Sequence, residues 1–362
     1  MATISLCMIV KNEEAVLERI LEIMKDIADE IIIGDTGSED GTKDIAYRYT
    51  SNVFDFEWCD DFSAARNFVW DKAKMDYRMW LDADDVIREK WQKELKELKE
   101  NIDIDTDVVM MKYVTGFDEG GNPSFFCYRE RLIKNKADYR WKGKVHEAVE
   151  PHGNVIYSDI EIEHRKIKEG YRDRNIKIYE NMIKRGERLE PRDKFYYGRE
   201  LYYNGRYEEG ERVLIDFLRE GKGWIENNID ACLQLSYCYE KTGEYEKRMK
   251  ALFYSFYFDV PRAEICCEVG RAFMEKEEYE KAVYWYGQAL RAKYDEYSGA
   301  FMQKDFYDYI PAIQLCVCYD RMGEYEKAFE YHIISKRIKP EAEEVKFNEK
   351  YFKELKELGV RS

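Results

Sequence analysis

Three carboxylates crowded into four residues are the first candidates for chemistry in this sequence. Asp82, Asp84 and Asp85 follow an apolar run that ends at Trp80-Leu81. Carboxylates at the end of a buried strand repel one another unless a cation offsets their charge. Mg²⁺ and Mn²⁺ prefer oxygen ligands and often take substrate phosphates as further ligands. The group therefore predicts a divalent metal site that binds a diphosphate, and an acidic helix cap before Val86 is the alternative.

A second candidate is Asp35, which ends the apolar run 30–34 and begins a loop rich in Gly, Ser and Asp. In open α/β sheets, ligands bind at the carboxyl ends of the strands. A carboxylate at that place can accept a hydrogen bond from a nucleobase imide or from a ribose hydroxyl. An ordinary strand–turn–helix connection with a helix cap is the alternative interpretation.

Two of the four histidines form the third group of candidates. His146 precedes Glu147, and His164 follows a later apolar run. A histidine can complete a metal site, and a nearby carboxylate can act as a general base. Because isolated histidines are often structural, these residues become candidates for a functional site only together with the other two groups.

The elements that must position these residues alternate in type along the first 165 residues. The patterns predict strands over 4–10, 30–34, 53–56 and 79–81, with helices between them over 13–26, 40–50 and 63–74, the last capped by Ser63. Further strands are expected over 108–114, 125–132 and 160–164. Strands that alternate with helices indicate an α/β fold with a mostly parallel sheet.

Composition narrows the class of protein. The chain has 362 residues and 45% hydrophobic residues, enough for two domains with full cores. With 59 basic and 74 acidic residues, its net charge of −15 disfavours binding to polyanions, so we expect no nucleic-acid partner.

The sequence also bears on compartment. We find no run that approaches 18 apolar residues and no basic leader, so we expect a cytoplasmic protein without a membrane span or targeting segment. The nine cysteines include no Cys-x-x-Cys pair and lie mostly in apolar runs. They are typical of buried thiols in a reducing compartment rather than of disulfides or a zinc site.

Residues 166–362 have a different character, because they contain a repeat rich in Tyr, Glu and Lys. Related segments share a tyrosine at positions 207, 245, 279 and 325, with separations of 38, 34 and 46 residues. Tetratricopeptide-type helix pairs repeat every ~34 residues. We therefore predict an all-α solenoid whose last interval holds an insertion around 295–308. Each pair would turn at a glycine, namely Gly205, Gly243 or Gly323.

The first 165 residues resemble the family-2 type of nucleotide-sugar glycosyltransferases, which have the GT-A fold. The resemblance rests on LCMIVKNEE at 6–14, DTGSEDGT at 35–42, DFSAARN at 61–67 and LDADD at 81–85, in the order of the family. The helical remainder resembles the repeat-bearing subgroup, which includes the bacteriocin-type peptide S-glycosyltransferases. The resemblance implies a GT-A domain over 1–165 and a tetratricopeptide-like domain over 166–362.

The resemblance also implies where the donor nucleotide binds. Asp35 would contact a uracil-like base. The backbone near Val10 and Lys11 would line the base pocket, with Glu13 beside it, and Arg66 would approach the nucleotide.

Further roles follow for the acidic motif. Asp82 would face the ribose or the sugar, with Ala83 beside it in the donor site, and Asp84 would ligate Mg²⁺ or Mn²⁺. A base carboxylate and a histidine usually follow the metal motif in this fold. Glu147 fits the first role and His164 the second. Since His146-Glu147 replaces the Glu-Asp pair common in the family, His146 is the alternative metal ligand.

Together these expectations describe an inverting, metal-dependent glycosyltransferase. It would move a hexose from a UDP-sugar, with UDP-glucose as the first guess, to an oxygen or sulfur of a peptide or protein side chain. A surface-glycan or lipid-linked acceptor is one alternative. A catalytically degenerate binding scaffold is another, since helical repeats grip peptides or form homodimers.

Overall fold

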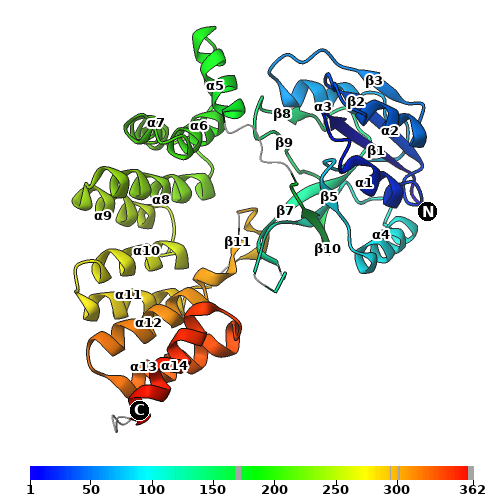
Figure 1. Ribbon diagram of the computed structural model, residues 1–362. Helices are drawn as coiled ribbons and strands as arrows, with labels where there is room; N and C mark the ends of the chain where they lie inside the picture. The colour runs from blue at the N-terminus through cyan, green and yellow to red at the C-terminus, as the bar shows by residue number, and fades with distance from the viewer. Residues whose placement is uncertain (119, 122, 168–172, 294, 301, 358–362) are drawn as a thin grey trace. The chain divides into compact units, whose positions relative to one another are not determined.

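The computed structural model describes residues 1–118, 120–121, 123–167, 173–293, 295–300 and 302–357 (Figure 1). The chain divides into two compact units. Unit 1 comprises residues 1–115 and 126–188, and unit 2 comprises residues 116–125 and 189–362. Among the described residues, no helix combines the length and apolar character needed to cross a membrane.

Unit 1 is built on a sheet with the strand order β3-β2-β1-β4-β7-β6-β10-β5. β1 pairs in parallel with β2 and β4, β2 with β3, and β6 with β10, whereas β7 and β5 join β4 and β10 antiparallel. The expected mostly parallel α/β sheet is thus confirmed. The strands are β1 (Ile4–Val10), β2 (Glu30–Asp35), β3 (Val53–Asp55), β4 (Tyr77–Trp80), β5 (Asp85–Val86), β6 (Val108–Phe117), β7 (Pro123–Lys134) and β10 (Val155–His164), with β8 (Trp141–Lys142) and β9 (Ala148–Val149) in a separate ribbon.

Apolar residues cover both faces of this sheet. On one face, Ile4, Leu6 and Met8 of β1 belong to the core that includes buried residues of α1 (Leu17–Met24) and α4 (Glu89–Asn101). On the other face, Cys7 belongs to a core with Trp70 and Trp80. Because β1 is buried on both faces, its sequence is a nearly continuous apolar run rather than an alternation of apolar and polar residues.

Two helix starts differ from expectation for local reasons. α1 begins at Leu17 rather than near residue 13, after a turn in which the Glu13 carbonyl accepts from the backbone N–H groups of Val16 and Leu17. α3 (Phe62–Trp70) is capped by Asp61, not by Ser63, since Asp61 accepts from the backbone of Ala64. α2 (Thr42–Tyr49) and α5 (Arg174–Lys184) complete unit 1.

Unit 2 consists of stacked helix pairs, as the repeat predicts (Figure 1). The pairs are α6 (Pro191–Tyr203) with α7 (Tyr207–Glu220), α8 (Ile225–Thr242) with α9 (Tyr245–Tyr254), α10 (Ala263–Met274) with α11 (Tyr279–Ala289), and α12 (Tyr309–Arg321) with α13 (Tyr325–Ile338), followed by α14 (Glu343–Glu357). Each repeated tyrosine is the first residue of the second helix of its pair. The expected insertion contains η2 (Glu296–Ser298), β11 (Met302–Gln303) and η3 (Lys304–Phe306), and η1 (Ser255–Tyr257) follows α9.

The turns within the pairs explain the repeated glycines. Gly205, Gly243 and Gly323 have φ angles of 74°, 74° and 76°, in the left-handed region that glycine adopts without steric cost. In the third pair the corresponding residue is Glu277, which has a φ of 59°. The third repeat therefore keeps the same turn geometry, although the left-handed conformation is strained for Glu277.

Candidate active site

The parallel pairing of β1, β2 and β4 brings their carboxyl ends to one edge of the sheet. Val10 lies opposite Asp35 in the β1–β2 register. Asp35 is buried, and its Oδ2 accepts from the backbone N–H groups of Gly37 and Ser38 at 3.0 and 2.9 Å. Its Oδ1 is buried without a hydrogen-bond partner among the described residues. This edge therefore offers a buried acceptor to a ligand donor, beside the exposed Lys11.

The loops that follow β1 and β2 are locked to each other. Asn12, with a φ of 56°, accepts from the backbone of Glu39 at 2.7 Å and donates its own backbone N–H to Ser38. The backbone N–H of Glu13 donates to Thr42 Oγ1 at 2.7 Å. These contacts fix the backbone of residues 10–14 beside Asp35. The family resemblance implies that the nucleobase would bind there.

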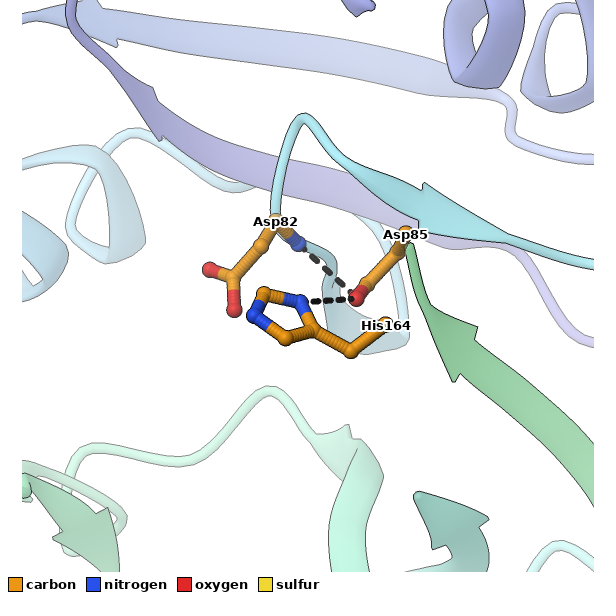
Figure 2. Close-up of side chains that lie close together, drawn as sticks. All are labelled: Asp82, Asp85 and His164. Carbon is orange, nitrogen blue, oxygen red and sulfur yellow. Dashed lines mark hydrogen bonds and ion pairs between the residues drawn. The ribbon is translucent and has the colours of Figure 1, made fainter. Parts of the chain in front are cut away.

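The acidic motif after β4 meets the end of β10. His164 lies directly opposite Asp85 in the antiparallel β5–β10 register. Figure 2 shows both side chains with Asp82, whose backbone N–H donates to Asp85 Oδ2 at 3.0 Å. Asp82, Asp85 and His164 can each present one ligand atom within 4.8 Å of the others. His164 Nδ1 also lies 3.1 Å from Asp84 Oδ1.

The chemistry of this group fits a divalent cation. Asp85 Oδ1 and His164 Nδ1 are 3.4 Å apart, yet neither atom has a partner in hydrogen-bond geometry among the described residues. Burial disfavours the imidazolium, but the carboxylates of Asp84 and Asp85 outweigh burial and raise the pKa of His164 to about 9. Oxygen ligands with one imidazole suit Mn²⁺ or Mg²⁺, and such an ion would offset the same negative field that favours the proton.

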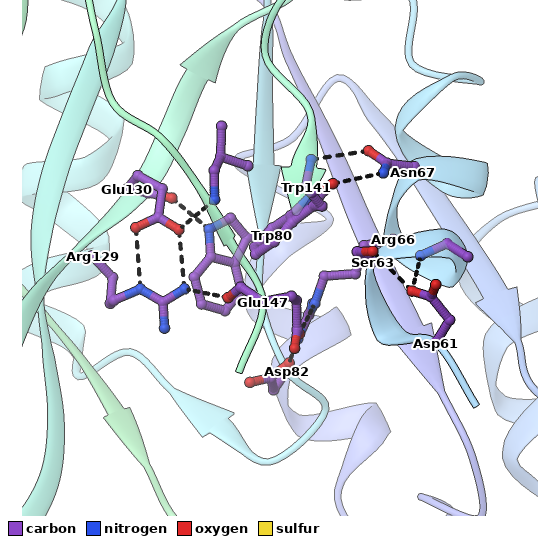
Figure 3. Close-up of polar contacts among 12 residues, drawn as sticks. Asp61, Ser63, Arg66, Asn67, Trp80, Asp82, Arg129, Glu130, Trp141 and Glu147 are labelled. Atoms are coloured by element: carbon purple, nitrogen blue, oxygen red, sulfur yellow. Dashed lines mark hydrogen bonds and ion pairs between the residues drawn. The ribbon is translucent and has the colours of Figure 1, made fainter. Parts of the chain in front are cut away.

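Arg66 connects the acidic motif to the loop between β8 and β9 (Figure 3). Its Nη2 donates to Asp82 Oδ1 at 2.9 Å, and its Nε donates to Glu147 Oε1 at 2.6 Å. The guanidinium lies 5.0 Å from the ring centroid of Trp80 and 4.8 Å from that of Trp141. Burial alone would favour the neutral forms of Arg66 and Asp82. The attraction between the two charges outweighs burial, so it raises the pKa of Arg66 and lowers the pKa of Asp82.

The β8–β9 loop that carries Glu147 is anchored on both sides. Trp141 exchanges two hydrogen bonds with the Asn67 side chain, both of 3.0 Å. Arg129 Nη2 donates to the Glu147 carbonyl at 3.3 Å, and His146 has a φ of 52°. Glu147, whose side chain is 11% exposed, is therefore held at its carboxylate by Arg66 of α3 and at its carbonyl by Arg129 of β7.

The structure thus gathers Arg66, Asp82 and Glu147 into one cluster, with Asp84 and His164 beside it. Ala83 is buried within the motif. His146 is not among the described residues that group around the potential ion, whereas Asp85 is. The sequence places Asp85 in the acidic motif, but it does not predict that Asp85 pairs with His164.

Two arginines of β7, the half-buried Arg129 and the fully buried Arg131, are functional candidates that sequence reasoning missed. Arg129 binds Glu130 and the Glu147 carbonyl, and Arg131 binds Asp85. Their signal in the sequence is an Arg-x-Arg in a strand next to apolar residues. This signal is weak, because alternating charge is also typical of a strand with one solvated face.

Comparison with known proteins shows which sequences parts of this chain resemble. Residues 5–159 match the sequence model of the Glycosyl transferase family 2. A TPR repeat-containing protein of Synechococcus elongatus is 37% identical over 151 residues, which cover 41% of this chain and 36% of that protein. The SPbeta prophage-derived glycosyltransferase SunS of Bacillus subtilis is 26% identical over 234 residues, covering 60% of this chain and 53% of that protein.

A third relative has a name that refers to a glycan. The lipopolysaccharide core biosynthesis glycosyltransferase LpsC of Rhizobium meliloti is 30% identical over 153 residues, which cover 40% of this chain and 56% of that protein. This chain therefore spans only about a third to just over half of the length of these relatives.

Proposed function

We propose that this chain, whose residues 5–159 form a glycosyl transferase family 2 domain, transfers a hexose from a UDP-sugar to a side chain of a peptide or protein. The observation that carries the proposal is the Arg66 bridge between Asp82 and Glu147, beside Asp84, Asp85 and His164. This bridge supports the proposal, because a base at Glu147 would act next to a metal–diphosphate site, at the edge of the sheet where Asp35 offers its buried acceptor.

The donor would lie across this edge. Asp35 Oδ1 would accept from the uracil imide, and the loop of residues 10–14 would line the base pocket. Asp82, held by Arg66, would face the ribose or the sugar. Asp84, Asp85 and His164 would hold Mg²⁺ or Mn²⁺, which supplies Lewis-acid stabilisation of the diphosphate leaving group when bound.

Glu147 would act as the general base. Arg66 occupies its Oε1, so Oε2 is left to take the proton of the acceptor hydroxyl or thiol. The acceptor oxygen or sulfur forms a bond to the anomeric carbon as the bond from that carbon to the diphosphate breaks. UDP leaves on the opposite face, so this single displacement inverts the anomeric centre.

The acceptor class rests on unit 2. Stacked helix pairs present an extended surface that suits a polypeptide. The likeness to LpsC favours a second candidate, a glycan or lipid-linked acceptor for surface polysaccharide. The two candidates share the donor chemistry and differ in what receives the sugar.

The test uses the full chain with a panel of UDP-sugars and measures UDP release with Mn²⁺, with Mg²⁺ or with EDTA. We expect metal-dependent hydrolysis of one donor, and Asp82→Asn should abolish it. Peptide and lipid-linked glycan pools are then added, and the mass shift of a hexose identifies the acceptor. Absence of both UDP release and UDP binding would contradict the proposal and favour a binding scaffold.

A further inference from the structure

Arg131 of β7 is a fully buried cation next to the candidate metal site. Its side chain is 0% exposed. The guanidinium lies 3.6 Å from the ring centroid of Trp80 and 4.3 Å from that of Tyr113, so aromatic rings replace water around the charge. A charge in such a place is costly unless an opposite charge lies in contact with it.

The contact that compensates Arg131 is Asp85, which is also 0% exposed. Arg131 Nη1 donates to Asp85 Oδ2 at 3.1 Å and to the Trp80 carbonyl at 3.1 Å. Its Nε and Nη2 are buried without hydrogen-bond partners among the described residues. The only carboxylate oxygen that the guanidinium contacts among the described residues is therefore Asp85 Oδ2, and its Nε and Nη2 groups stay unsatisfied, which is costly in a buried place.

This arrangement fixes the direction of Asp85. Its Oδ2 accepts from both Arg131 Nη1 and the backbone N–H of Asp82, so this oxygen is occupied twice. The other oxygen, Oδ1, lies 3.4 Å from His164 Nδ1. Rotation of the carboxylate away from His164 would break both bonds to Oδ2.

We propose that Arg131 is a positioning residue that holds the Asp85 carboxylate toward His164 and thereby sets the affinity of the site for a divalent cation. This inference rests on the proposed function, because it assumes that Asp85 and His164 help to hold the ion. Arg131 touches neither the donor nor the acceptor and acts through Asp85 alone.

The first experiment measures Mn²⁺ binding to the full chain without nucleotide, by the loss of the electron paramagnetic resonance signal of free Mn²⁺. Arg131→Met keeps the length of the side chain and removes its charge and hydrogen bonds. We expect Mn²⁺ affinity to fall about 10–100-fold, the usual effect of removing a group that orients a ligand. Arg248→Met is the matched control, since Arg248 is a 2% exposed arginine of unit 2 that pairs with Glu275; its Mn²⁺ affinity should equal that of wild type.

A second measurement separates positioning from general support of the fold. Asp85→Asn should weaken Mn²⁺ binding, and Arg131→Met added to Asp85→Asn should weaken it no further. A further tenfold loss in the double variant, or Mn²⁺ affinity unchanged by Arg131→Met, would overturn the inference. If near-ultraviolet circular dichroism shows that Arg131→Met does not fold, Arg131→Lys takes its place in the same cycle, with a smaller loss expected.

The wild-type protein distinguishes the two levels of the proposal. Wild type that binds no Mn²⁺, with or without UDP, would contradict the metal requirement of the proposed function. Wild type that binds Mn²⁺ as tightly as Arg131→Met would contradict the role of Arg131 only.

Discussion

The carboxylate of Glu147 lies 2.6 Å from Arg66 Nε, although 81 positions separate the two residues in the sequence. Arg66 is itself held between Trp80 and Trp141. The orientation of the candidate base therefore depends on a cation that is fixed by packing, and not on the residues of the β8–β9 loop alone. Pre-organisation of this kind lowers the cost of bringing a base to its substrate.

Glu147→Gln should preserve the hydrogen bond to Arg66 and remove the ability to accept a proton. We expect turnover to fall about 10²–10⁴-fold, because a positioned base contributes about that much, while the affinity for the UDP-sugar stays close to wild type. Initial rates with acceptor and titration of the donor by calorimetry measure the two effects. Glu150→Gln is the control, since Glu150 is an exposed residue at the end of the same ribbon. Wild-type turnover in Glu147→Gln would remove Glu147 from the role of base.

Asp84→Ala should weaken metal-dependent donor binding. Asp84 Oδ1 is 3.1 Å from His164 Nδ1, so its removal takes away a carboxylate beside the candidate ion. Donor affinity in the presence of Mn²⁺ should fall to the value that wild type shows in EDTA. Asp71→Ala removes an exposed aspartate that pairs with Arg140, and it should leave the donor affinity unchanged. Equal donor affinity of wild type with Mn²⁺ and with EDTA would argue against a metal on Asp84.

The sequence predicts those parts of the site that are local in the chain. Asp35 and the run from Asp82 to Asp85 stand at strand ends, so periodicity alone places them at the ligand-binding edge. Arg131 could not be placed in this way, because it reaches Asp85 only through the insertion of β7 antiparallel beside β4. Such a pairing depends on contacts between distant segments, which no local pattern records.

Helix boundaries show the same limit on a smaller scale. Ser63 and Asp61 are both good N-cap residues, and the hydrogen bond that Asp61 makes to Ala64 decides between them. α1 begins at Leu17, after a turn in which the Glu13 carbonyl accepts from the backbone of Val16. Periodicity shows which residues share a helix face, but it does not show where the first turn becomes regular.

Glu277→Gly should stabilise unit 2. Glu277 has a φ of 59° where the other three turns have glycine, and a non-glycine residue in this region costs about 1–2 kcal/mol. The greater entropy of glycine in the unfolded chain offsets part of this, so we expect a gain of about 0.5–1 kcal/mol in the free energy of unfolding by urea. Gly243→Ala is the reciprocal variant and should destabilise. A loss of stability in Glu277→Gly would show that the Glu277 side chain makes contacts worth more than the strain.

His332 should make the stability of unit 2 depend on pH. The side chain is buried between the rings of Phe329 and Phe352, and its Nδ1 has no hydrogen-bond partner among the described residues. Burial lowers the pKa of His332 from its ordinary 6.5, against the attraction of Glu349 and with the help of Lys336. The folded protein therefore holds the neutral imidazole to lower pH than the unfolded chain does.

The sign of the effect follows from proton linkage. Above pH 6.5 both states hold neutral His332 and the stabilisation is complete. As the pH falls through 6.5 the unfolded chain binds a proton first, so the free energy of unfolding declines, by at most about 1.4 kcal/mol per pH unit. Urea denaturation between pH 5 and 8 should show a flatter profile for His332→Leu than for wild type. His152→Gln removes an exposed histidine whose pKa is raised by Asp138, so it should not flatten the decline. A decline of equal slope in wild type and His332→Leu would assign the acid sensitivity to other groups.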